Sequence, residues 1–179
     1  MKPVVICLGL ALLTAASAHA ADSAKSVALV RAMRSDEIAV ATAKLAFLGG
    51  SMRERYGKTN NACVKRISYT DYTAGWARVV ESVLSPPEID ASLVFFQSDA
   101  GVKYVEGLLR RLRSRQGDAS VLPEVSGKEE ITPAQLAAIS DFSRSDLGQK
   151  VIGKDLTLSP AAEAMGRETT EKIAAKCGG

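Results

Sequence analysis

Apolar residues recur along this chain at intervals of three and four, which is the spacing of one face of an α-helix. Near the N-terminus Val27, Val30, Ile38 and Leu45 follow this spacing, and Arg34 interrupts it. The strict alternation that is typical of a half-buried strand is nearly absent. The sequence therefore predicts an all-α protein, a small helical bundle of about six or seven helices in a single domain.

Capping signals mark where several of these helices start and stop. Gly49-Gly50 is expected to end the first helix or helix pair, because glycine tolerates the left-handed conformation of a C-terminal cap. The segments 85–88 (Ser-Pro-Pro-Glu) and 132–135 (Thr-Pro-Ala-Gln) each supply a capping hydroxyl, an early proline and a capping-box residue. Residues 52–70 are polar and are expected to form a loop with one turn of helix around Cys63.

The two proline-containing helix starts lie in register and reveal an internal repeat. Residues 85–105 align with residues 132–152 without a gap. Each unit predicts a capped helix, a short break and a second helix with a carboxylate in its first turn. The shared motif consists of Phe95, Ser98, Asp99, Gly101 and Lys103 in the first unit and of Phe142, Ser145, Asp146, Gly148 and Lys150 in the second. We favour a mainly structural role for it, and the alternative is an anion-binding site that is used twice.

Residues 95–103 (Phe-Phe-Gln-Ser-Asp-Ala-Gly-Val-Lys), preceded by a Ser-Pro helix start and an acidic residue, resemble the hallmark of a bacterial family catalogued as domain of unknown function 2059. A second, weaker copy of the hallmark falls at residues 142–150. Members of that family typically carry an aromatic pair followed by Ser-Pro-x-Gly-x-Lys. This chain differs in having Asp99 and Asp146 at the proline position. The resemblance implies a small, exported, helical protein, and it implies no activity.

The first twenty residues have the pattern of a cleaved secretory signal. Lys2 supplies a positive charge, an uncharged apolar run follows, and Ala18-His19-Ala20 matches a cleavage site. We expect residues 1–20 to be removed and residues 21–179 to form the mature domain in the periplasm or outside the cell. The apolar run is about half of the ~20 residues that span a bilayer, so no transmembrane segment is expected after cleavage.

Cleavage would remove the single histidine of the chain, and with it the commonest general base and metal ligand. We therefore expect no catalytic residue, no metal site and no cofactor, and we expect the protein not to be an enzyme. A hydrolase that uses paired carboxylates remains an alternative, with Asp90, Glu106, Asp141 and Asp146 as the available acids.

Two cysteines, Cys63 and Cys177, remain after signal cleavage. In an oxidising compartment two cysteines most simply form a disulfide, which would tie the C-terminus to a loop about one third of the way along the chain. Two free thiols are the alternative.

A run of arginines offers a partner-binding face. Arg110, Arg111, Arg113 and Arg115 follow one another on a predicted helix, and they suit an acidic protein or an anionic envelope polymer. The alternative is an ordinary solvated helix surface. Lysine and arginine total 23 against 20 acidic residues, a balance that does not favour nucleic-acid binding. The sequence favours a non-catalytic interaction protein of the cell envelope, with a periplasmic immunity protein that neutralises a toxin as a narrower alternative.

Overall fold

Helices form nearly all of the regular structure in the computed structural model, which describes residues 23–115, 124–125 and 130–178. A helix over 23–33 is followed by α2 (Ser35–Leu48), α3 (Arg53–Tyr56), α4 (Asn61–Arg66), a 3-10 turn (Thr70–Tyr72), α5 (Thr73–Val83), α6 (Pro86–Gln97), α7 (Asp99–Arg115), α8 (Pro133–Arg144), α9 (Asp146–Ile152), α10 (Lys154–Thr157) and α11 (Pro160–Cys177). The predicted all-α fold class is confirmed. The predicted signal segment 1–20 lies outside the described residues.

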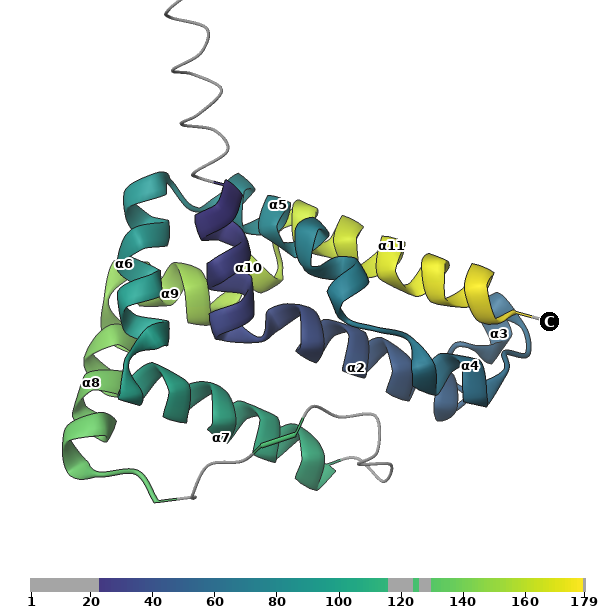
Figure 1. Ribbon diagram of the computed structural model, residues 1–179, viewed down its shortest axis with the longest axis horizontal. Helices are drawn as coiled ribbons and strands as arrows, with labels where there is room; N and C mark the ends of the chain where they lie inside the picture. The colour runs from purple at the N-terminus through teal and green to yellow at the C-terminus, as the bar shows by residue number, and fades with distance from the viewer. Residues whose placement is uncertain (1–22, 116–123, 126–129, 179) are drawn as a thin grey trace, which may run out of the picture.

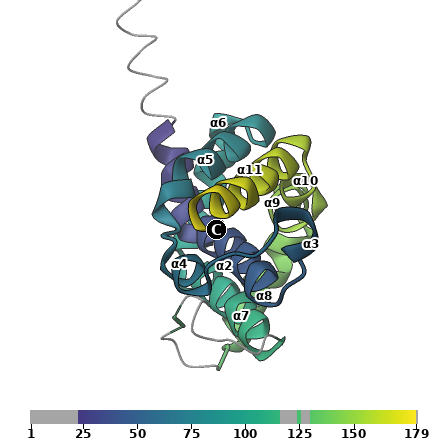
Figure 2. The same cartoon turned by 90° about the vertical axis from the view of Figure 1, so that its right-hand side faces the viewer.

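The helices surround a core that draws on nearly every element. Figure 1 shows α5 and α11 side by side along one edge, α2 next to them, and α6, α8 and α9 gathered at the end far from the C-terminus. In both views α7 runs below α2 (Figures 1 and 2). Fully buried side chains such as Leu29, Val80, Leu109 and Ile173 come from the first helix, α5, α7 and α11. No helix in the described part of the chain combines the length and apolar character needed to cross a membrane.

The first predicted helix is a pair of helices that meet at Arg34. This residue adopts left-handed backbone angles, φ 53° and ψ 31°, and is the non-glycine residue with positive φ among those described. Because these angles are those of a left-handed helix, the right-handed helix cannot continue through Arg34. The break turns α2 away from the preceding helix (Figure 1), and α2 ends before Gly49 and Gly50, as predicted.

The polar segment 52–70 contains more helix than expected. The turn of helix expected around Cys63 is present as α4, and a second short helix, α3, precedes it. The amide of Cys63 donates to Oδ1 of Asn60 at 3.0 Å, so Asn60 caps α4. With these short helices and the break at Arg34, the structure has more helices than the predicted six or seven.

The predicted caps of α6 and α8 are present. The backbone amide and the hydroxyl of Ser85 both donate to Glu88 at 2.8 Å. Thr132 and Gln135 exchange reciprocal bonds, with the Gln135 amide donating to the Thr132 hydroxyl at 3.2 Å. Both units therefore begin as their sequences predict.

The C-terminal end of α11 is joined to α4. Cys63 and Cys177 form a disulfide with their Cα atoms 5.5 Å apart. Beside it, the amide of Asn60 donates to the Cys177 carbonyl at 2.8 Å, and Thr59 forms an isolated β-bridge with Gly178. The pairing agrees with the prediction and closes the bundle at this end.

Candidate functional site

A groove of about 650 Å³ runs along α2. One wall is a face of α2 made of Ile38, Ala39, Thr42, Ala43 and Ala46, which recur at helical spacing. Small alanine side chains leave room on this face that larger residues would fill. From Ser35 to Ala46 the lined part of α2 is about 16 Å long, at ~1.5 Å of rise per residue.

The facing wall combines the two repeat units. Tyr104 and Val105 of α7 line the groove, as do Val151 and Ile152 of α9, which occupy the corresponding positions of the second unit. Trp76 of α5 and Gly166 of α11 also line it. The packing of distant helices therefore forms the groove, and no single sequence segment contains it.

The threonines of the groove direct their hydroxyls to their own helices. Thr42 donates to the Ile38 carbonyl at 2.8 Å, Thr169 to Met165 at 2.8 Å, and Thr170 to Gly166 at 2.8 Å. Because these hydroxyl hydrogens are already engaged, the threonines offer methyl groups and weak acceptors to a ligand. The lining is thus less polar than its residue types suggest.

Charged side chains are missing from the described lining of the groove. Tyr104 is the titratable residue there, and burial raises its pKa, so it stays neutral at ordinary pH. Trp76 places a buried indole nitrogen in this wall without a hydrogen-bond partner. An environment of this kind favours an apolar ligand.

A second hollow, of about 490 Å³, lies at the C-terminal end of α2. Phe47 and Leu48 of α2 line it together with Arg53 and Lys58. Its described lining includes two cations and no carboxylate. Met52, which lines the groove, directly precedes Arg53 in the chain.

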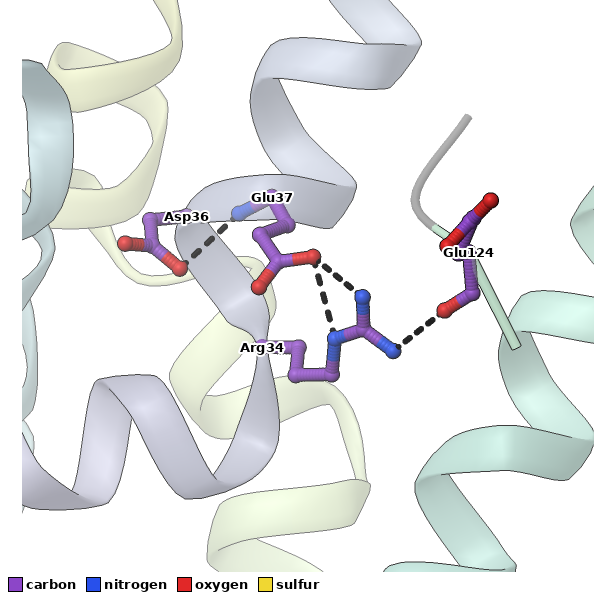
Figure 3. Close-up of polar contacts among 4 residues, drawn as sticks. All are labelled: Arg34, Asp36, Glu37 and Glu124. Atoms are coloured by element: carbon purple, nitrogen blue, oxygen red, sulfur yellow. Dashed lines mark hydrogen bonds and ion pairs between the residues drawn. The ribbon is translucent and has the colours of Figure 1, made fainter. Parts of the chain in front are cut away.

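The helix break at Arg34 lies at the other end of α2 (Figure 3). The Arg34 guanidinium donates to Glu37 Oε2, from Nε at 3.0 Å, and to the backbone carbonyl of Glu124 at 2.9 Å. Asp36 points away from this pair and accepts from the Thr73 hydroxyl at 2.5 Å. Burial raises the pKa of the Asp36 carboxyl, against the lowering effect of the Thr73 hydrogen bond. These contacts hold the break and keep its charges out of the groove.

The repeated motif lies at the helix junctions and does not line the groove. Ser98 caps α7 and Ser145 caps α9, each accepting from the amide of a motif glycine, at 3.2 and 3.0 Å. The Phe95 and Phe142 rings stack with their centroids 3.8 Å apart, so corresponding residues of the two units meet. Asp99 and Asp146 lie in the first turns of α7 and α9, and Gly101 and Gly148 lie at the helix junctions. Lys103 pairs with Glu106 at 3.4 Å, and Lys150 pairs with Glu88 at 2.6 Å.

The arginine run does not form one uniform face. Arg110 and Arg113 are half-buried and line a hollow of about 440 Å³ with Glu124, and Arg110 lies 3.3 Å from Glu106. Arg111 is exposed and donates to the Gly107 carbonyl at 3.2 Å. The side chain of Arg115 lies outside the described part of the chain.

The sequence analysis missed the groove. The signal that could have indicated it is the set of alanines on α2, since a helix face of small residues in a bundle either packs closely against a neighbour or leaves space. Which of the two occurs depends on the placement of α7, α9 and α11, which periodicity does not determine.

Comparison with known proteins supports the resemblance found in the motif. The model of a family described as "Uncharacterized protein conserved in bacteria (DUF2059)" matches residues 128–176. The match covers the second repeat unit and most of α11, whereas the first unit, where we placed the stronger resemblance, lies outside it. No curated protein and no solved structure gives a significant match. The chain thus matches, over residues 128–176, a bacterial family that is described as uncharacterised. The matched residues include Val151, Ile152 and Gly166 of the groove.

Proposed function

We propose that the protein is a non-catalytic binding protein that holds an apolar ligand in the groove along α2. The observation that carries this proposal is the lining of the groove, which combines an apolar surface with the absence of charged side chains in its described part. Its volume of about 650 Å³ suits a small ligand, because ligand pockets typically measure about 300–1,000 Å³.

The positions of the available carboxylates also favour binding over catalysis. Asp90 pairs with Lys25 at 2.8 Å, and Glu106 lies between Lys103 and Arg110 at 3.4 and 3.3 Å. None of the four candidate acids lines the groove. A carboxylate hydrolase would need two acids facing one cleft, so this alternative has no support from the geometry.

The same proposal places the protein in the periplasm or outside the cell. Residues 1–20 have the pattern of a cleaved signal. Disulfides such as that between Cys63 and Cys177 persist mainly in oxidising compartments. Both observations support a role in the cell envelope. The groove is a better supported binding site than the arginine run, because the run is divided between a hollow and an exposed side.

Binding can be measured through Trp76, the single tryptophan of the chain, which lines the groove. We would titrate the oxidised protein with N-phenyl-1-naphthylamine, an uncharged apolar fluorophore, and follow energy transfer from Trp76. Two variants provide the comparison. At Gly166, in the groove, and at Gly107, outside it, an added Cβ would meet nothing within 4 Å.

We expect the wild type and Gly107→Phe to bind the fluorophore with similar affinity. Gly166→Phe should bind about tenfold more weakly or not at all, because its ring occupies the groove. Equal binding by all three proteins, or no binding by the wild type, would contradict the proposal.

A further inference from the structure

Two methionines line the groove, one beside each end of α2. Met33 lies just before α2 begins at Ser35, and Met52 lies just after it ends at Leu48. Both side chains are half-buried and pack against the core, so each keeps part of its surface accessible from solvent. A small reagent in solution can therefore reach both of them.

The third methionine within residues 21–179 has the opposite surroundings. Met165 of α11 is 5% exposed, and its sulfur packs against Gly75 of α5 inside the core. A thioether reacts with an oxidant only where the oxidant can reach it. The chain therefore places two oxidisable methionines in the groove and a protected one in the core.

Oxidation would change the polarity of the groove. A methionine sulfoxide carries a polar oxygen on a side chain that was apolar. The hydroxyls of Thr42, Thr169 and Thr170 already donate to their own helices, so they do not donate to that oxygen. An apolar ligand that covered the sulfoxide would remove its hydration without replacing it, which disfavours binding.

We infer that Met33 and Met52 are sites of oxidative modification, and that their conversion to sulfoxides by a peroxide releases the ligand from the groove. In this step the sulfur attacks one peroxide oxygen, an S–O bond forms and the O–O bond breaks. The sulfur gives up an electron pair, and the hydroxide that leaves takes the proton of the transferred oxygen and departs as water. This inference rests on the proposed function and adds regulation to the same site.

The first measurement locates the modification. The disulfide-bonded protein is treated with hydrogen peroxide while it stays folded, and the sulfoxides are located by mass spectrometry of its peptides. Met33 and Met52 should be converted before Met165, because access of the peroxide to the sulfur limits the reaction. If neither reacts faster than Met165, the inference is overturned, and if one does not, that residue is not a modification site.

The second measurement tests whether the modification weakens binding. The affinity for N-phenyl-1-naphthylamine is read from the emission of the fluorophore itself, so that the result does not depend on Trp76. Peroxide treatment should weaken binding by the wild type about tenfold.

Two leucine variants provide the comparison. Met33→Leu combined with Met52→Leu should bind like the untreated wild type before and after treatment, because leucine keeps the volume and apolar character of methionine and lacks sulfur. Met165→Leu is the matched control, because it keeps both groove methionines and should lose affinity on treatment as the wild type does.

Repair separates the modification from general damage. Methionine sulfoxide reductases for both sulfoxide epimers, supplied with a dithiol reductant, should restore the affinity of the treated protein, and the reductant alone should not. If the treated wild type carries both sulfoxides and binds as before, or if the double variant loses affinity equally, the inference is wrong while the apolar groove stands. If the untreated wild type does not bind the fluorophore, the proposed function itself is wrong, and the inference with it.

Discussion

At the residue scale, two helical glycines have opposite surroundings. A Cβ on Gly101 would lie 2.1 Å from the carbonyl oxygen of Phe95 and 2.6 Å from the Cα of Phe96, both of which are backbone atoms. A Cβ on Gly166 would meet nothing within 4 Å. The first glycine is required by the tight junction between α6 and α7, and the second leaves space in the groove.

We therefore expect opposite effects of alanine at these two positions. Gly101→Ala should lower the free energy of unfolding by about 1–3 kcal/mol, because backbone atoms must move to admit the methyl group. Gly166→Ala should raise it by up to about 1 kcal/mol, because alanine favours a helix interior. Urea unfolding of both variants measures the difference. A Gly101→Ala protein that unfolds with the same free energy as the wild type would contradict the described junction.

At the element scale, the sequence predicted helix ends better than helix packing. The caps at Ser85 and Thr132 follow from neighbouring residues, so local chemistry is enough to predict them. The turn of helix expected around Cys63 is α4, whereas α3 was missed, because its four residues carry too little periodicity. The groove was missed because it depends on contacts between helices that are distant in the chain. The duplication of residues 85–105 and 132–152 remains a prediction, consistent with the equal lengths of α6 and α8, each of 12 residues.

Glu88 connects the two units in a way that local sequence does not reveal. It belongs to the capping box of α6, and it also bonds Lys150 of α9 at 2.6 Å. The hydrogen bond from Lys150, followed by the bonds from Ser85, lowers the pKa of Glu88 to about 2. Because the pKa is lowered on folding, the ionised carboxylate stabilises the fold at pH values above its ordinary pKa. This contribution is lost as the pH falls toward about 2.

The Glu88→Gln protein should therefore have a lower free energy of unfolding than the wild type at neutral pH. The two free energies should converge as the pH falls from 4.5 toward about 2. Glu163→Gln, which changes an exposed carboxylate in the first turn of α11, serves as the control. Unfolding free energies measured across this pH range provide the test. A difference between wild type and Glu88→Gln that stays constant with pH would contradict the pairing.

At the scale of the whole molecule, the disulfide closes a long loop that includes α5 to α10 and both repeat units. Cys63 and Cys177 are 114 residues apart, so the bond strongly restricts the unfolded chain. Cys63→Ser should lower the free energy of unfolding by about 2–4 kcal/mol in the oxidised protein. In excess reductant the variant and the wild type should unfold alike. If the free energy of unfolding of Cys63→Ser were below that of the wild type by the same amount with and without reductant, the effect would arise from packing at Cys63 and not from the disulfide.

The central claim is that an apolar ligand lies in the groove against Trp76. The most direct measurement is the quenching of Trp76 fluorescence by dodecanol brominated in its chain, because bromine quenches only at close range. The account predicts saturable quenching in the wild type and in Gly107→Phe. In Gly166→Phe it predicts quenching that needs about tenfold more ligand, or no quenching. Quenching that rises without saturation, or that is the same in all three proteins, would contradict it.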